Sequence, residues 1–276
     1  MKRSLRRPLF LVLAAALLVL SQRMIDTHTH IYLKHFAEDR LEMLERAKEV
    51  GVEHLFLPNI DRESVAAMKE LSEAHSNIYP MMGLHPSHVK EDYEEELAVV
   101  WSELNSDYPY VAVGEIGIDL YWDKTFIKAQ QDAFDRQISK AKEMNLPIVI
   151  HCRDAFDETF EVLESHRGEG LKGIFHCFTG NLEQAHQALG LNLKLGIGGV
   201  VTFKNGGLDK VVADLKPEDL VLETDAPYLA PMPFRGKRNE PSYLRYVAQK
   251  LADIYQMPLE ELDRITTQNA LKIFGI

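Results

Sequence analysis

The chain has 276 residues, 46% of them hydrophobic, so it can bury a large core as one α/β domain or two small ones. Aspartate and glutamate total 42 against 31 lysines and arginines, which gives a formal net charge of −11. This balance excludes a protein that grips nucleic acid through an extended basic surface. A phosphate-bearing substrate must instead be drawn in locally, by metal ions or a small basic cluster. The two cysteines, Cys152 and Cys177, are too few for a disulfide framework.

The first 23 residues differ in composition from the rest of the chain. KRSLRRP is basic, and Leu9–Leu20 is an uninterrupted run of twelve apolar residues. Because about 20 residues are needed to cross a bilayer, we expect no stable membrane span, and the run matches the centre of a signal peptide. Three interpretations stay open for residues 1–23: a secretion signal or anchor, an extension from an upstream start codon before Met24, and a structural helix. We expect a cytoplasmic protein, with export or anchoring as the alternative.

From Met24 onward, short β-branched runs alternate with longer amphipathic segments. The expected strands are Met24–His30, Val52–Pro58, Ile78–His85, Val111–Gly117, Pro147–Cys152, Leu171–Phe178, Leu193–Gly198 and Leu220–Asp225. The expected helices are Ala37–Val50, Arg62–His75, Tyr93–Leu104, Phe126–Met144, Ala155–His166, Tyr243–Tyr255, Leu259–Ile265 and Gln268–Phe274. Each strand is followed by a helix or by a loop that could hold one. Eight such units over about 250 residues predict a single (β/α)8 TIM barrel spanning residues 24–276, with a doubly wound open sheet as the alternative.

Histidines and carboxylates gather at the carboxyl ends of the predicted strands, in THTH, GEIGID, IHCRD, FHCFTG and LETDAP. Barrel enzymes build their active sites from these ends and the loops that follow them. We therefore expect six side chains to converge on a metal site: His28, His30, Glu115, His151, His176 and Asp225. Six ligands exceed the need of one ion and suit two divalent ions about 3.5–4 Å apart that share a carboxylate.

The strand order predicts how the ligands divide. The first ion takes the ligands of the first and last strands, which are neighbours in a closed barrel: His28, His30 and Asp225. The second ion takes those of two adjacent strands: His151 and His176. Glu115, on the fourth strand, is expected to bridge the two ions.

Asp225 and Glu115 are the predicted catalytic carboxylates. Two divalent ions lower the pKa of a shared water, so that a hydroxide forms near neutral pH. Asp225 is the expected proton acceptor, since a carboxylate that binds a metal through one oxygen keeps the other free. Glu115, as the bridge, has both oxygens committed and serves the metal pair rather than acting as a base.

Substrate phosphates need cationic partners on the same side of the barrel. Arg153 follows a predicted ligand by two residues, and Arg235 and Arg238 lie in the loop after the eighth strand. Arginine suits bidentate phosphate contacts, although an ordinary solvated loop is the alternative. His85 in GLHP is expected to contact substrate or to support a carboxylate, and Asp119 to support the site from behind.

Two aromatic residues near the site allow two interpretations. Tyr228 and Phe234 could stack on a base or ribose, as aromatic side chains do with single strands, but packing is the favoured interpretation.

Seven ordered motifs, THTH, GLHP, GEIGID, HCRD, HCFTG, ETDAPYLAP and RGKRNEP, closely resemble those of the TatD-like metal-dependent hydrolases, a branch of the amidohydrolase-type barrels associated with DNase activity. The resemblance runs from Met24 to the C-terminus. It implies a two-metal site made of the same six residues and hydrolysis of phosphodiester bonds in DNA. Two departures are residues 1–23, which family members generally lack, and Ala226, where a cysteine or serine often follows the aspartate.

The leading hypothesis is therefore a deoxyribonuclease or phosphodiesterase that acts on DNA ends or small phosphoesters with two Mg, Mn or Zn ions. An amidohydrolase that cleaves a small-molecule amide or lactone is the runner-up. Many such enzymes bridge their ions with a carbamylated lysine, whereas Glu115 takes that place here, which favours phosphoester chemistry. A non-enzymatic metal-binding protein is the third hypothesis. The sequence makes no prediction of the oligomeric state.

Overall fold

The computed structural model describes residues 24–121 and 123–276, and within them eight parallel strands form a closed barrel. The strands are β1 (Met24–Asp26), β2 (Val52–Pro58), β3 (Ile78–Met81), β4 (Val113–Asp119), β5 (Ile148–Arg153), β6 (Gly173–Phe175), β7 (Leu193–Ile197) and β8 (Leu220–Leu222). They pair in the order β1-β2-β3 and β4-β5-β6-β7-β8. Bridges from Met82 to Val113 and from Thr29 to Ala226 join the two sheets. The predicted (β/α)8 barrel is thus confirmed, and the open-sheet alternative is wrong.

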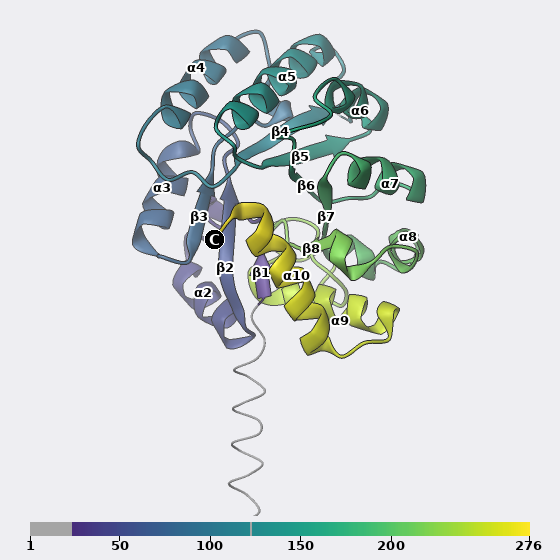
Figure 1. The fold of residues 1–276 in the computed structure, drawn as a ribbon. Helices are drawn as coiled ribbons and strands as arrows, with labels where there is room; N and C mark the ends of the chain where they lie inside the picture. The colour runs from purple at the N-terminus through teal and green to yellow at the C-terminus, as the bar shows by residue number, and fades with distance from the viewer. Residues whose placement is uncertain (1–23, 122) are drawn as a thin grey trace, which may run out of the picture.

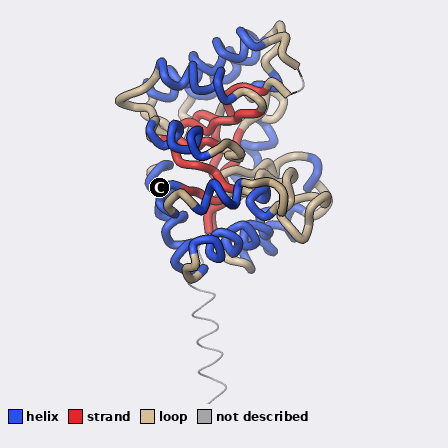
Figure 2. The backbone as a smooth tube through the Cα atoms, turned by 90° about the vertical axis from the view of Figure 1, so that its right-hand side faces the viewer, coloured by secondary structure: helices blue, strands red, loops and turns tan. Residues whose placement is uncertain are grey.

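Helices surround the strands on the outside (Figure 1). They are α2 (Arg40–Glu49), α3 (Val65–Ala74), α4 (Tyr93–Leu104), α5 (Ile127–Glu143), α6 (Phe156–Ser165), α7 (Leu182–Gly190), α8 (Leu208–Ala213), α9 (Leu244–Tyr255) and α10 (Leu259–Phe274). Figure 2 shows the strands enclosed by helices, with the longer loops on the side away from the C-terminus. The helices α7 and α8 lie where the sequence left the connection open, and α10 is one helix where two were expected.

One apolar cluster fills the lumen near the N-terminal ends of the strands. Its members come from the strands, from the residue before β4, and from α10: Ile25, Phe56, Met81, Ala112, Val149, Ile174, Val221, Ala270 and Phe274. The helix α10 packs against β1 and β8 (Figure 1), and the rings of Phe274 and Phe56 stack with centroids 3.8 Å apart. The lumen is therefore packed and covered at this end, which leaves the C-terminal end for polar side chains.

Among residues 24–121 and 123–276, no helix has both the length and the apolar character needed to cross a bilayer. The apolar run Leu9–Leu20 lies outside the described residues.

Replacing Phe274 by alanine is expected to destabilise the barrel. The Phe274 side chain is 8% exposed and stacks on Phe56, and deleting a buried phenylalanine costs about 3–5 kcal/mol. Urea denaturation should show this loss in the free energy of unfolding. Ile276→Ala, at a side chain 44% exposed, is the matched control and should change stability little. Equal stability of the two variants would contradict the role of α10 in covering the lumen.

Candidate metal centre

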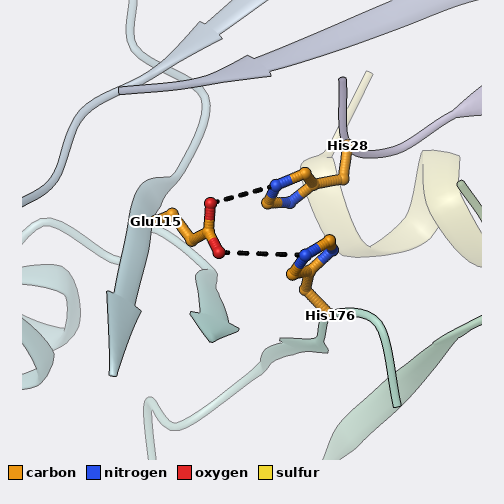
Figure 3. Close-up of side chains that lie close together, drawn as sticks. All are labelled: His28, Glu115 and His176. Carbon is orange, nitrogen blue, oxygen red and sulfur yellow. Dashed lines mark ion pairs between the residues drawn. The ribbon is translucent and has the colours of Figure 1, made fainter. Parts of the chain in front are cut away.

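Glu115 lies at the centre of the polar end of the barrel. The register between β4 and β5 shifts between Gly114 and Ile116, on either side of Glu115. The Glu115 amide donates a hydrogen bond to the carbonyl of Asn59, which directly follows β2. The carboxylate is 2% exposed, and it faces His28 and His176 (Figure 3).

The Oε2 oxygen of Glu115 faces two nitrogens from the segment that follows β1. It lies 3.1 Å from His28 Nε2 and 3.5 Å from His30 Nε2. Asp225, from the loop after β8, brings its Oδ1 to 3.8 Å and 3.6 Å from the same two nitrogens. We call this group of four side chains the Oε2 side of the centre.

The Oε1 oxygen of Glu115 faces three imidazoles, one on β5 and two in the segments that follow β3 and β6. It lies 2.9 Å from His151 Nδ1, 3.4 Å from His85 Nε2 and 3.8 Å from His176 Nε2. We call these residues with Glu115 the Oε1 side. The ring of His176 also stacks on that of His28 with centroids 3.4 Å apart, so the two sides are in direct contact. The structure thus brings together all six predicted ligands and adds His85, for which a substrate contact or a support role was expected.

The protonation of the imidazoles shows what charge the centre requires. Burial holds the pKa of His28 well below its ordinary value, so this imidazole is neutral and keeps a lone pair. Burial also lowers the pKa of His176, but Glu223 and Glu115 outweigh it and raise that pKa to about 10. The pKa of His151 rises to about 9 because hydrogen bonds to Asp119 and Glu115 outweigh burial. The carboxylates therefore attract positive charge into the centre.

Divalent cations fit this donor set. Neutral imidazoles and carboxylates are the ligands that Zn²⁺ and similar ions prefer, and the atoms of two triads, His28–His30–Asp225 and His85–Glu115–His151, each lie within 4.8 Å of one another. Cations bound there would supply the positive charge that protons on His151 and His176 otherwise supply.

A hydrogen-bond chain fixes the tautomer of His30. The hydroxyl of Tyr32 donates to the carbonyl oxygen of Pro58 at 2.7 Å, and it also lies 3.0 Å from His30 Nδ1. Since the phenol has one proton and the carbonyl can only accept, His30 Nδ1 must donate to Tyr32. In the neutral imidazole the lone pair then lies on Nε2 of His30, which faces the centre as a metal ligand requires.

Buried carboxylates orient two further imidazoles. Asp119 Oδ2 lies 2.9 Å from His151 Nε2, in the support role expected for it. Glu223 Oε1 lies 2.9 Å from His176 Nδ1, and the Glu223 side chain is fully buried. Sequence analysis missed Glu223, although its position two residues before Asp225 in LETD puts both on one face of the strand expected over Leu220–Asp225.

The three arginines predicted to bind phosphate have different surroundings. The guanidinium of Arg153 lies 3.7 Å from the ring centroid of Tyr121, and that of Arg235 lies 4.7 Å from the ring of Phe203. Arg238 instead forms a bidentate ion pair with Asp39, at 2.6 Å and 2.7 Å. This pair joins the loop after β8 to the start of α2. Because Asp39 occupies the guanidinium of Arg238, this residue stabilises the loop in the structure.

A closed (β/α)8 barrel with imidazoles and carboxylates at the carboxyl ends of its strands has the architecture of a metal-dependent hydrolase. Comparison with known proteins defines the family. The chain belongs to the TatD related DNases, whose family model matches residues 25–275.

Three relatives illustrate the match. YabD of Bacillus subtilis, named as an uncharacterized metal-dependent hydrolase, is 42% identical over 92% of this chain and 99% of YabD. The 3'-5' ssDNA/RNA exonuclease TatD of Pantoea ananatis is 33% identical over 92% of this chain and 100% of its own length. The crystal structure of YjjV, a TatD homolog from Escherichia coli, covers 93% of this chain and 99% of YjjV, with a TM-score of 0.87 at 31% identity. The resemblance read from the motifs is confirmed, and the protein is a metal-dependent hydrolase.

Tyr32→Phe is expected to weaken metal binding about 10- to 100-fold, because the variant removes the group that fixes the His30 tautomer. Competition with a chromophoric chelator measures the affinity, and ¹⁵N shifts of the His30 ring report the tautomer directly. Tyr93→Phe is the matched control, since the Tyr93 hydroxyl donates to Asp132 on the exterior. An unchanged affinity and unchanged ring shifts in Tyr32→Phe would contradict the assignment.

Proposed function

We propose that this hydrolase uses two divalent cations to cleave phosphodiester bonds in DNA, with single-stranded ends as its substrate. The observation that carries the proposal is the position of Glu115, whose two oxygens face separate sets of nitrogen donors. That arrangement suits a carboxylate that bridges two ions. The name of the Pantoea ananatis relative as a 3'-5' ssDNA/RNA exonuclease supports the choice of substrate.

We assign the ligands by the two sides of Glu115. One ion would be held on the Oε2 side by His28, His30 and Asp225. The other would be held on the Oε1 side by His151 and His176. Both would share Glu115, and His85 lies close enough to the Oε1 side to contact either the ion or the substrate. The geometry leaves the choice among magnesium, manganese and zinc open to experiment.

When bound, such ions lower the pKa of water and neutralise charge on the non-bridging phosphate oxygens. The residues of the chain supply position and proton transfer. Asp225 is 14% exposed and is held in place by an amide hydrogen bond to the His28 carbonyl at 2.9 Å. Its Oδ1 faces the two histidines that follow β1, which leaves Oδ2 to accept the proton of the attacking water. Glu115, buried with both oxygens engaged, is unsuited to this task.

Arg153 is the proposed phosphate contact. It lies at the end of β5, two residues after His151, so both side chains share a face of the strand. Since the net charge of −11 repels a polyanion at long range, binding must depend on local contacts of this kind. Arg235, in the loop after β8, is proposed to contact phosphates farther along the strand.

The two alternative functions have less support. The bridging position holds Glu115 rather than a lysine, and the family model is that of a DNase, which favours phosphodiesters over amides and lactones. Relatives named as metal-dependent hydrolases disfavour a purely metal-binding role.

Metal removal and substrate choice test the proposal together. The full chain, stripped with EDTA, should lose activity and regain it with Mg²⁺, Mn²⁺ or Zn²⁺. The metal-loaded protein should shorten single-stranded DNA and leave a panel of amides and lactones intact. Turnover of an amide or lactone, with DNA untouched under every metal, would establish the amidohydrolase alternative instead.

Two carboxylate variants separate metal binding from catalysis. Glu115→Ala should lose bound metal, measured by atomic emission, because both sides of the centre lose a shared oxygen. Asp225→Asn keeps an oxygen toward the histidines that follow β1, and its kcat should fall about 10²- to 10⁴-fold, the usual effect of a lost general base. Full metal content in Glu115→Ala would contradict the bridge.

Arg153→Ala and Arg238→Ala form a matched pair. Arg153→Ala should raise KM for DNA. Arg238→Ala should leave KM unchanged and lower the melting temperature by about 2–4 °C, the shift that a loss of about 1 kcal/mol gives in a domain of this size. The reverse pattern would return Arg238 to the substrate contacts.

Residues 1–23 call for a separate test. The relatives named above match 92% of this chain and nearly all of their own length, which supports a hydrolase domain that begins near Met24; a cytoplasmic location is the proposal for that domain. Intact mass of the protein from its own cell decides the matter. A mass that begins at Met24 supports this proposal, whereas one that begins at Gln22 would indicate export, and the full chain in membranes would indicate an anchor.

A further inference from the structure

Exposed apolar side chains gather beside the candidate metal centre. Within the described residues, the exposed large hydrophobic side chains are Leu41, Tyr121, Tyr228, Leu229, Met232 and Ile276. Four of these six lie in the loops that follow β4 and β8, at the end of the barrel that holds the centre. Tyr121 and Tyr228 are the aromatic members of this set, with exposures of 49% and 47%. Two half-exposed tyrosines at an active-site rim offer flat surfaces for a ligand.

Tyr121 is anchored to the Oε1 side. Asp119 joins it to the centre, because one carboxylate oxygen lies 2.9 Å from His151 Nε2 and the other accepts a hydrogen bond from the Tyr121 amide at 3.0 Å. The guanidinium of Arg153 lies 3.7 Å from the centre of the Tyr121 ring. A cationic phosphate contact and an aromatic ring are therefore stacked together beside His151.

Tyr228 is anchored to the Oε2 side. Its amide donates to the Asp225 carbonyl at 2.8 Å, and Asn239 Nδ2 donates to the carbonyl of Tyr228 at 2.7 Å. The Tyr228 ring lies 6.2 Å from that of His30 and 6.3 Å from that of His35, both edge-on. The second exposed tyrosine is thus fixed beside the other half of the donor set.

We propose that Tyr121 and Tyr228 are base-stacking positions for the two nucleosides on either side of the scissile phosphate. The inference rests on the proposed function and adds the side chains that would hold the bases of its single-stranded substrate. A phosphate at the centre would lie between the two tyrosines, since the amide of Tyr121 is bound by Asp119, the partner of His151, and the ring of Tyr228 lies 6.2 Å from that of His30. Its flanking bases would each stack on a different tyrosine, which requires that they be separated from one another and unpaired. A duplex, with its bases stacked on each other, does not meet this requirement.

Charge supports stacking as a source of affinity. The chain carries a net charge of −11, so phosphate attraction is weak beyond the local arginines. Stacking of a base on an aromatic ring tolerates any sequence and needs no cationic surface. The guanidinium of Arg153 over Tyr121 extends the same platform, because arginine stacks on rings and also binds phosphate.

The test compares substrates that differ in their bases alone. The full chain, loaded with Mn²⁺, is given oligothymidylate and an oligomer of equal length in which every nucleotide is an abasic tetrahydrofuran phosphate. Tyr121→Ala and Tyr228→Ala should each raise KM for oligothymidylate about 5- to 150-fold, the range expected for one lost stacking contact. They should leave KM for the abasic oligomer unchanged. Tyr121→Phe and Tyr228→Phe should retain the KM of the unaltered protein, because the ring is kept.

Leu41→Ala is the matched control, since Leu41 is 68% exposed and lies on α2; its KM for both substrates should be that of the unaltered protein. An alanine variant whose KM for oligothymidylate is unchanged, or rises equally for the abasic oligomer, would overturn the stacking role while DNA cleavage stands. Failure of the unaltered protein to cleave either oligomer under any metal would overturn the proposed function, and the stacking role with it.

Discussion

The structure of the polar end depends on one buried anion. Glu115 is 2% exposed, and a carboxylate in such a place is costly unless positive or hydrogen-bonding groups surround it. Burial opposes its ionisation, yet the surrounding imidazoles, among them His151 through a hydrogen bond and His176 through its charge, hold the pKa of Glu115 well below its ordinary value. The anion therefore persists, and imidazoles from β5 and from the segments after β1, β3 and β6 converge on it.

The barrel separates the residues that stabilise it from those that carry its chemistry. The apolar cluster with Phe56 and Phe274 fills the lumen near the N-terminal ends of the strands. Along β5 and β6 the donor set begins two residues farther on: Val149 belongs to the cluster and His151 to the centre, and Ile174 and His176 repeat the pattern. Residues i and i+2 of a strand share a face. On these strands, therefore, one lumen-facing residue belongs to the apolar cluster and the next lumen-facing residue belongs to the candidate metal centre.

This alternation explains which features the sequence could predict. Eight short β-branched runs predict the strands of the barrel. Polar residues at the carboxyl ends of these runs, at lumen-facing positions, predict the site. The strand and helix expected over Val52–Pro58 and Tyr93–Leu104 match β2 and α4 to the residue. The expected strands around His176 and Asp225 extend too far, because Cys177 and Asp225 adopt left-handed backbone angles, with φ of 44° and 56°. Such angles depend on tertiary contacts that β-propensity does not record.

Contacts between distant parts of the chain explain the remaining differences between the sequence predictions and the structure. Arg238 stands in a loop on the active-site side, but Asp39, which is 199 positions away in the sequence, binds its guanidinium. The capping box of Asn181 and Gln184 at the start of α7, by contrast, is a local signal of the kind that predicts a helix start. Glu223 could also have been predicted from the sequence as a site residue, since it is two positions from Asp225, the same spacing that separates His28 and His30.

The two sides of Glu115 differ in the groups that bind the second ring nitrogen of each imidazole, the one that faces away from the centre. His151 and His176 have carboxylates behind them, from Asp119 and Glu223, and a carboxylate partner makes an imidazole a more basic ligand. His30 has the neutral phenol of Tyr32 behind it, and its neighbour Asp225 is the more exposed carboxylate, at 14% against 2% for Glu115. Cations bound here would therefore be held more firmly on the Oε1 side. The Oε2 side has weaker donors and a carboxylate that solvent can reach, which is what the proposed role of Asp225 as proton acceptor requires.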